Sequence, residues 1–452
     1  MSRILLLSAL AALAALSCFA QEARKERIGE FRYLGRHDSF FYDVYVTSAG
    51  NYAATGRTEA GADPEPFWVV LSDRNGREIW SSTFPQDQGG FDEGDATSII
   101  ETDDGDFVVG GQMELNGRMT FVVMKCDAEG EQLWWRTYGG NSVGLCLAVI
   151  EPKGGGILAC GTVGERGSEQ AHAVMLEPDG DIVWEQTYDN GVCFNAVREI
   201  QDGFLFADYG PDRGLTRVNG RGEFVWQHRV SGYLLGLVSC PVGGGFAACG
   251  SLNRMALLVR FDDQGNEQWS RTYNRIDNNY RGVANCLLQL PDGGFLMVGE
   301  RPLIWSTYRT TAQIEIRVDA DGNLMWHRGA AGILVMGYLS VVRDIDSLTV
   351  IAGSVDLRQQ PAGSDFVGIL DKVFPERSAP RIVNYSPEEL QLQVMRLDTV
   401  HFSVEAIDYQ EDDIEYEWLM DDSVRIGREA RQDVVFTELW DHTVTCLSLI
   451  HI

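Results

Sequence analysis

Histidine and cysteine are the residue types best suited to metal binding and nucleophilic chemistry, and their spacing in this chain forms no recognisable site. The seven histidines are scattered, without an HExxH pair. The cysteines form no CxxC pair, which argues against structural zinc. Glycine-rich stretches such as 243–245 lack the Lys-Ser/Thr sequence of a phosphate-binding loop. We therefore expect no catalytic residues, no metal site and no cofactor.

The charge balance excludes another class of partner. The 452 residues include 66 Asp and Glu against 37 Lys and Arg, a formal net charge of −29. Such a surface repels phosphate, and the lysines (Lys25, Lys125, Lys153 and Lys372) form no cluster, so we expect no nucleic-acid partner. An apolar fraction of 44% suffices for a large core, and this length favours two or three domains.

Residues 1–20 have the pattern of a secretory signal peptide: Arg3, an apolar run over 4–15, then small residues ending at Ala20. We predict cleavage after Ala20, export to the cell surface or medium with the periplasm as an alternative, and no transmembrane segment. Cys18 leaves lipidation open. Most of the other cysteines lie in apolar strand-like runs, where a thiol behaves as a small buried hydrophobe.

A repeat of about fifty residues dominates the chain. Six times an Asp, Glu or Asn is followed by Gly after three residues and by Trp after four more. The glycines are Gly76, Gly130, Gly180, Gly222, Gly265 and Gly322, and the tryptophans are Trp80, Trp134, Trp184, Trp226, Trp269 and Trp326. We interpret these residues as structural: the glycine takes a positive φ in a tight turn, and the tryptophan packs between repeats.

A second signature alternates with the first and consists of a Gly- or Asp-rich turn, an apolar strand and a closing glycine. Its closing glycines are Gly56, Gly110, Gly161, Gly210, Gly250, Gly299 and Gly353. With an apolar strand before each turn, every repeat holds four short strands, which is typical of a β-propeller blade. The last repeat lacks its tryptophan strand, and 29–33 supplies a similar one. We therefore predict an all-β fold: a seven-bladed β-propeller over 21–375, closed by its N-terminal strand.

The run 123–140, with Lys125, Asp127, Gly130, Trp134 and a Tyr-Gly-Gly sequence at 138–140, resembles the repeats of secreted bacterial β-propeller proteins. That resemblance implies architecture and supplies no catalytic residues. Quinoprotein dehydrogenases, outer-membrane assembly propellers and sialidase Asp-boxes are similar, but the spacing of their turn residues differs by one residue.

After 375 the repeat ends, and 376–452 resembles the start of an Ig-like or PKD-like module through Ala406, Asp408, Tyr416, Trp418 and Asp421. We predict a partial Ig-like β-sandwich that is incomplete, because such a fold needs further strands. The ending 447–452 looks like translated adapter sequence, which would mean that the natural C-terminus is missing.

The remaining expectation concerns function. The connections at 57–66, 84–95, 274–282 and 301–311 vary between repeats, and function concentrates on variable loops of rigid scaffolds. We predict a non-catalytic exported binding or scaffold protein, monomeric, that presents this loop face to a protein or glycan ligand, with Tyr280, Trp305 and Tyr308 as contacts. The alternatives are packing of these aromatics within their own loops, an extracellular enzyme acting on glycans or other polymers at a channel mouth, and a cell-envelope assembly factor.

Overall fold

The computed structural model forms two compact units, Arg24–Pro375 and Met1–Ala23 with Glu376–Ile452, which are described separately. The residues that it describes are 3–6, 27–33, 39–58, 67–85, 91–140, 142–165, 167–210, 213–273, 282–302, 311–329, 335–343, 349–356, 366–373, 381–387, 391–394, 399–407, 414–421, 424–436 and 444–450. None of these segments is a helix with the length and apolar character needed to cross a lipid bilayer.

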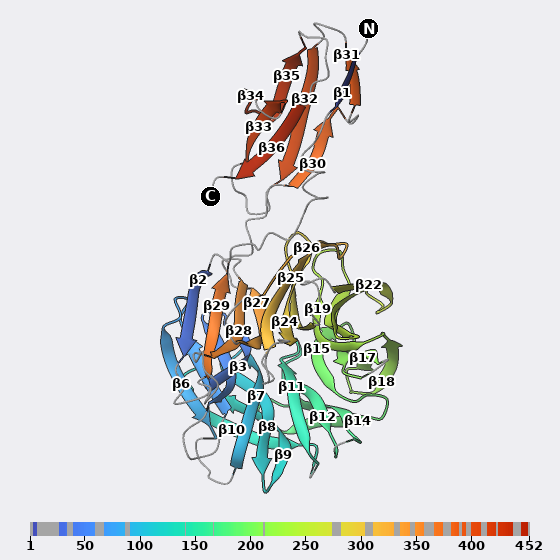
Figure 1. The fold of residues 1–452 in the computed structure, drawn as a ribbon. Helices are drawn as coiled ribbons and strands as arrows, with labels where there is room; N and C mark the ends of the chain where they lie inside the picture. The colour runs from blue at the N-terminus through green and yellow to red at the C-terminus, as the bar shows by residue number, and fades with distance from the viewer. Residues whose placement is uncertain are drawn as a thin grey trace. The chain divides into compact units, whose positions relative to one another are not determined.

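The larger unit is a β-propeller (Figure 1). Six of its blades are antiparallel sheets of four consecutive strands. Blade 1 contains β3 (Ser39–Val46), β4 (Tyr52–Thr58), β5 (Phe67–Ser72) and β6 (Glu78–Phe84). Blade 2 contains β7 (Phe91–Glu101), β8 (Phe107–Leu115), β9 (Arg118–Cys126) and β10 (Gln132–Tyr138). Blade 3 contains β11 (Gly144–Ile150), β12 (Ile157–Val163), β13 (Gln170–Leu176) and β14 (Ile182–Tyr188).

The remaining consecutive blades follow the same order. Blade 4 contains β15 (Phe194–Ile200), β16 (Gly203–Asp208), β17 (Gly214–Asn219) and β18 (Phe224–Arg229). Blade 5 contains β19 (Tyr233–Ser239), β20 (Phe246–Leu252), β21 (Met255–Phe261) and β22 (Glu267–Tyr273). Blade 6 contains β23 (Val283–Gln289), β24 (Phe295–Pro302), β25 (Thr311–Val318) and β26 (Leu324–Gly329).

The last repeat does not form a blade of its own. Its strands β27 (Val335–Arg343), β28 (Thr349–Asp356) and β29 (Phe366–Val373) are joined by β2 (Arg27–Tyr33) in a composite sheet, where Phe31 pairs with Leu370. The expected pairing of the N-terminal strand is thus confirmed. The predicted count of seven blades is wrong. Six blades consist of four consecutive strands, and the last repeat encodes only three strands. The composite sheet packs between blades 1 and 6.

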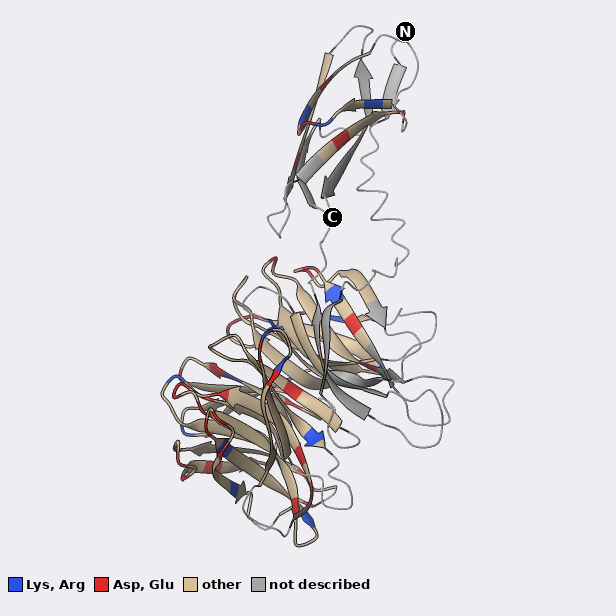
Figure 2. Ribbon diagram, turned by 90° about the vertical axis from the view of Figure 1, so that its left-hand side faces the viewer, with Lys and Arg blue, Asp and Glu red and all other residues tan. Residues whose placement is uncertain are grey.

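Burial divides each blade into inner and outer strands. First strands of neighbouring blades contact one another around the centre. The middle strands are almost wholly buried, as in β5, whereas the outermost strands β6, β10, β14, β18 and β22 alternate between exposed and half-buried side chains. Figure 2 shows acidic and basic residues interspersed over the described strands and turns. The core therefore lies between the faces of adjacent blades.

The repeat tryptophans link each blade to the next. The Trp134 Nε1 donates to the Pro178 carbonyl at 3.2 Å, and the ring lies against the backbone of Gly180, where a Cβ would stand 3.2 Å from it. Gly180 has φ +87°, which only glycine adopts without strain. The Tyr138 hydroxyl donates to the Gly180 carbonyl at 2.8 Å. The same turn glycine meets the preceding tryptophan for the pairs Trp80–Gly130, Trp184–Gly222, Trp226–Gly265 and Trp269–Gly322.

The smaller unit holds two three-stranded sheets, with strand orders β30-β32-β35 and β34-β33-β36, and a β1–β31 pair. Phe402, Trp418 and Val444 belong to a core to which both sheets contribute. The structure shows these sheets, and their strand order does not show the expected partial Ig-like β-sandwich. The strands are β1 (Arg3–Leu6), β30 (Arg381–Ser386), β31 (Gln391–Val394), β32 (Thr399–Ile407), β33 (Ile414–Met420), β34 (Val424–Gly427), β35 (Arg431–Val435) and β36 (Val444–Ile450).

Candidate binding site on the loop face

The blades have two ends. We call one end the loop face: there the first strand of each blade begins and the second strand stops. We call the opposite end the turn face. The predicted contacts Tyr280, Trp305 and Tyr308 all lie outside the described residues. The site is therefore built from the described part of the loop face, and it centres on blade 4, where the repeat is broken.

The first strand of each blade has a β-bulge. In five blades the residue just before that bulge pairs with a glycine of the second strand. A Cβ on Gly56 would lie 1.7 Å from the Phe40 carbonyl oxygen, so a side chain cannot fit there. In blade 4 this position is Asp208, paired with Phe194. The expected closing residue Gly210 is therefore corrected to Asp208. The five glycines are Gly56, Gly111, Gly161, Gly250 and Gly299, so Gly111 also replaces the expected Gly110.

Asp208 is fully buried and organises the loop that precedes β15. Its Oδ1 accepts hydrogen bonds from the backbone N–H groups of Val192 at 3.1 Å and Cys193 at 3.3 Å. Its Oδ2 accepts one from Gln227 Nε2 at 3.2 Å, and the same amide donates to the Asn190 carbonyl at 3.0 Å. Burial raises the pKa of the Asp208 carboxyl, while the two backbone donors lower it. The carboxylate thus fixes the connection between blades 3 and 4.

Next to Asp208, an aromatic pair reaches the surface of the loop face. The Tyr209 N–H donates to the Cys193 carbonyl at 2.7 Å, which places the ring beside that of Tyr233 at the start of β19. The ring centroids are 4.9 Å apart and the planes are inclined by 33°. Tyr209 is 43% exposed. Exposed aromatic rings on a fixed backbone contribute large contact area at a small entropic cost. Sequence reasoning missed this pair, although Tyr209 follows the residue that breaks the glycine pattern.

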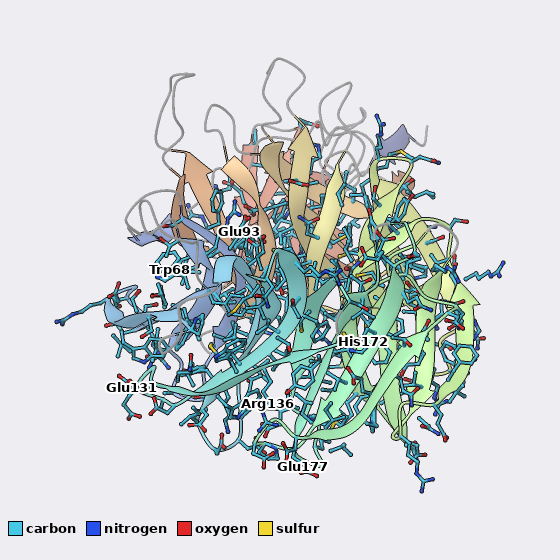
Figure 3. The ribbon with its side chains drawn as sticks, turned by 90° about the horizontal axis from the view of Figure 1, so that it is seen from below. Trp68, Glu93, Glu131, Arg136, His172 and Glu177 are labelled. Atoms are coloured by element: carbon cyan, nitrogen blue, oxygen red, sulfur yellow. The ribbon has the colours of Figure 1, made fainter. Side chains whose placement is uncertain are left out.

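Elsewhere on the loop face, polar groups of blades 1 and 2 bind one another. Arg57 Nη1 lies 3.1 Å from Glu93 Oε1 and 3.6 Å from Asp95 Oδ1. The Tyr42 hydroxyl and the Gln112 amide donate to the Asp95 carboxylate at 3.2 and 3.0 Å. In Figure 3 the labels of Glu93 and Trp68 lie close together. These charges pair internally, so the cluster joins two blades.

His172 forms a similar junction between blades 2 and 3 (Figure 3). It is 1% exposed, and its Nε2 lies 3.2 Å from Glu185 Oε1. The same Glu185 oxygen accepts the N–H of Gly139 at the end of blade 2, at 2.7 Å. The bond from His172 lowers the pKa of Glu185, against the effect of burial. The carboxylate therefore ties the two blades.

Side chains near the centre of the propeller serve the same purpose. Asp43 accepts the N–H of Val44 at 2.9 Å and that of Ile99, in the next blade, at 3.0 Å. Burial raises the pKa of Asp43, and bonds from serine and backbone donors lower it. Arg198 Nη1 donates to the Val197 carbonyl at 2.7 Å. The inner strands are thus not apolar throughout: Asp43 joins blades 1 and 2, whereas the bond of Arg198 stays within its own strand.

The described thiols are poor nucleophiles. Burial is the largest influence on them and raises the pKa of Cys126 to about 12 and that of Cys240 to about 11. Cys146 and Cys249 are fully buried and also have raised pKa values. A thiol with such a pKa remains protonated at neutral pH. Their interpretation as small buried hydrophobes is confirmed.

One catalytic pattern was overlooked by sequence reasoning. The residues at 140–144, Gly-Asn-Ser-Val-Gly, match GxSxG, which in hydrolases holds a nucleophilic serine on a strand-to-helix turn. Here the segment connects β10 with β11, so a strand follows instead of a helix. The pattern therefore lacks the structural context of a nucleophile elbow.

Neither a protein-family model nor a curated protein sequence matches this chain. Similar solved structures include Sqt1 from Chaetomium thermophilum, with 14% identity and a TM-score of 0.44 over 78% of this chain and 98% of that one. BamB from Moraxella catarrhalis has 12% identity and a TM-score of 0.41 over 78% and 99%. The Dos1 propeller has 10% identity and a TM-score of 0.44 over 77% and 95%. These likenesses concern the fold alone.

Proposed function

We propose that this protein is an exported, non-catalytic binding or scaffold protein whose loop face captures a protein or glycan ligand. The observation that carries the proposal is the Tyr209–Tyr233 pair, in which Tyr209 is exposed and Tyr233 half-buried. Asp208 and its backbone donors hold the connection beneath the pair. A rigid aromatic surface of this kind suits recognition, because little conformational freedom is lost on binding.

The charged side chains described above support binding over catalysis. Asp95, Glu185 and Asp43 each accept hydrogen bonds that join neighbouring blades, and the described cysteines stay protonated. Export is the second part of the proposal and rests on the signal-peptide pattern of residues 1–20. Under this proposal the loop face meets ligands outside the cytoplasm.

The test is a glycan array and a cell-surface pull-down with the chain beginning at Gln21. We expect one probe class to be retained, and Tyr209→Ala to weaken its binding about thirtyfold, as for an aromatic hot spot worth about 2 kcal/mol. Phe224→Ala is the matched control, because Phe224 is 49% exposed on the same blade but begins β18 at the turn face. Retention of no probe, or equal losses in both variants, would contradict the proposal.

A further inference from the structure

In three blades a buried cation, and in blade 4 a half-buried one, braces the turn between the first and second strands. Lys125, which pairs in register with Trp134, places its Nζ 2.7 Å from Asp104 Oδ2 and 2.9 Å from Asp106 Oδ2. Arg317 occupies the same position in blade 6 and pairs with Asp292. Corresponding residues in blades 4 and 5 donate to carbonyls of their own turns. We call these four residues the turn cations: Lys125, Arg217, Arg260 and Arg317.

Blade 3 lacks both the cation and its partners. The residue paired with Trp184 is Met175, and the turn has glycine at the two positions that Asp104 and Asp106 hold in blade 2. These are Gly154 and Gly156, as the shared Gly105–Thr102 and Gly155–Pro152 turn hydrogen bonds show. The ion pair that braces this turn in blades 2 and 6 is therefore absent from blade 3, and blade 1 likewise has an apolar residue, Leu71, opposite Trp80.

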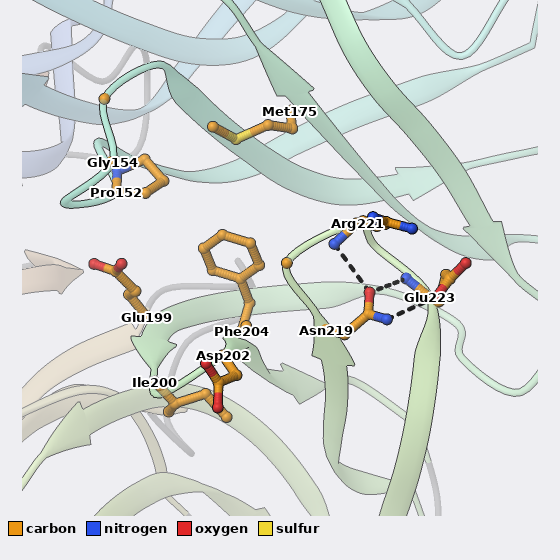
Figure 4. Close-up of a pocket in the computed structure, with 13 residues that line it drawn as sticks. Pro152, Gly154, Met175, Glu199, Ile200, Asp202, Phe204, Asn219, Arg221 and Glu223 are labelled. Carbon is orange, nitrogen blue, oxygen red and sulfur yellow. Dashed lines mark hydrogen bonds between the residues drawn. The ribbon is translucent and has the colours of Figure 1, made fainter.

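A hollow of about 580 Å³ lies where that pair is missing (Figure 4). From blade 3 it is lined by Met175 and the glycine turn, and from blade 4 by Ile200 and Phe204. Phe204 is 6% exposed and Met175 is half-buried. The interior of the hollow is thus an apolar surface of a thioether, an aliphatic chain and a phenyl ring.

The rim of the hollow is mainly acidic. Glu199 and Asp202 of blade 4 line it, together with Glu223, which accepts a bond from the Asn219 amide at 2.7 Å. Glu199 also accepts the Lys153 N–H at 3.0 Å. Arg221 contributes one positive charge and lies on the opposite side of Phe204 from Glu199 in Figure 4. The lining therefore contains three carboxylates and one guanidinium.

The interface between blades 2 and 3 has a carboxylate in the corresponding position. Glu151 of blade 3 accepts the Asp103 N–H at 2.7 Å, just as Glu199 accepts that of Lys153. Burial raises the pKa of Glu151, the Asp103 N–H lowers it, the charges of Asp103 and Asp104 raise it further, and Lys125 in blade 2 lowers it. Glu199 and Met175 both line the hollow, and Met175 stands where blade 2 has its turn cation. The hollow therefore has apolar and acidic groups like those around a turn cation, but blade 3 places no cation there.

We propose that this hollow binds the cationic side chain of a lysine or arginine from a polypeptide partner. The aliphatic stem would lie on Met175 and Phe204, and the ammonium or guanidinium would face Glu199 and Asp202. An aliphatic stem on an apolar surface with a charged head at its rim is the usual arrangement of these side chains. The site lies on the turn face, so it is separate from the proposed loop-face function.

The test uses the full chain with its methionine methyl groups labelled with ¹³C, and the Met175 signal is assigned by its loss in Met175→Leu. The probes are Nα-acetyl-lysine N-methylamide, the arginine equivalent and the uncharged norleucine equivalent. We expect the cationic probes to shift the Met175 signal saturably and to bind about tenfold more tightly than norleucine. Added salt should weaken the difference. Equal binding of all three probes, or no shift at Met175, would overturn the proposal.

Variants locate the site independently of that signal. Met175→Lys supplies a turn cation from within, so saturation-transfer NMR should show loss of lysine-probe binding, whereas Met175→Leu should keep it. If Met175→Lys fails to fold, Glu199→Gln with Asp202→Asn should weaken cationic probes about tenfold and leave norleucine unchanged. Cationic binding that survives these changes rules out the site. Tyr209→Ala should leave probe binding unaffected, which separates this proposal from the loop-face function.

Discussion

The interface between blades 2 and 3 and that between blades 3 and 4 are built from the same contacts, but they differ at both ends. In each, a tryptophan lies on the turn glycine of the next blade, as Trp134 on Gly180 and Trp184 on Gly222. Each also has a tyrosine hydroxyl that donates to that glycine, at 2.8 and 2.7 Å. Only the second interface carries Asp208 on its loop face and the acidic hollow on its turn face.

This comparison separates what holds the propeller together from what distinguishes one blade from another. The shared contacts recur because every blade must bury its faces against its neighbours. Asp208 and Met175 break the pattern near the ends of their strands, the first beside the exposed Tyr209 and the second at the hollow. Departures from an internal repeat therefore mark candidate sites even without related sequences.

The largest expected effect tests whether the two interfaces are equally strong. Phe121, in the core between blades 2 and 3, and Phe194, in the core between blades 3 and 4, are both fully buried. We expect Phe121→Ala and Phe194→Ala each to lower the free energy of unfolding of the propeller by about 3–5 kcal/mol, because each leaves a cavity. Urea unfolding followed by tryptophan fluorescence measures both losses. A much smaller loss for either variant would show that the interfaces are not equivalent.

A smaller effect concerns the turn glycines. A Cβ at Gly222 would lie 2.6 Å from the Trp184 ring, whereas one at Gly180 would lie 3.2 Å from Trp134. Both glycines have positive φ, so each alanine variant should cost about 1–3 kcal/mol, with Gly222→Ala the more damaging. The control is Gly105→Ala, where φ is +88° and no atom lies within 4 Å of the added carbon. Unfolding in urea gives the order, and an equal loss at all three positions would mean that the ring contact is irrelevant.

The smallest effect is a pH dependence confined to the first interface. Although partial burial raises the pKa of Asp104, bonds from Lys125 and Thr102 lower it to about 2 from an ordinary 3.8. A lowered folded-state pKa stabilises the protein above pH 3.8, and this contribution is lost as the pH falls towards 2. Since Asp104 is 55% exposed, Asp104→Asn should cost less than about 1 kcal/mol at pH 7.

Urea unfolding at pH 7 and at several values below 3.8 measures this difference, with Asp103→Asn as the neighbouring control. A cost of Asp104→Asn that persists unchanged down to pH 2 would contradict the assignment to this ion pair. The interface between blades 3 and 4 has Gly154 at this position and offers no counterpart.

The strands and turns were accessible to sequence reasoning because Asp, Gly and Trp recur at fixed spacing. The count of blades was wrong, because the prediction counted the composite sheet of the last repeat and β2 as a seventh blade. Asp208 was missed because β15 has a bulge at Asn195, and only the strand register shows which residue pairs with Phe194. Met175 was missed although the sequence carries a signal: it stands two residues before Glu177, a position that is Lys or Arg in four other repeats. Tyr280, Trp305 and Tyr308 remain predictions.

The pairing of β2 with β29 has a consequence for the order of events during synthesis. A ribosome releases residues 27–33 long before 366–373, so β2 must wait for its partner while the other blades emerge. Pairings between segments so distant in sequence form slowly, since closing the intervening loop costs entropy before any contact compensates for it. During that interval β2, β3 and the newest blade expose unpaired edges or uncovered faces to other chains. The final assembly of the propeller therefore depends on release of the last repeat.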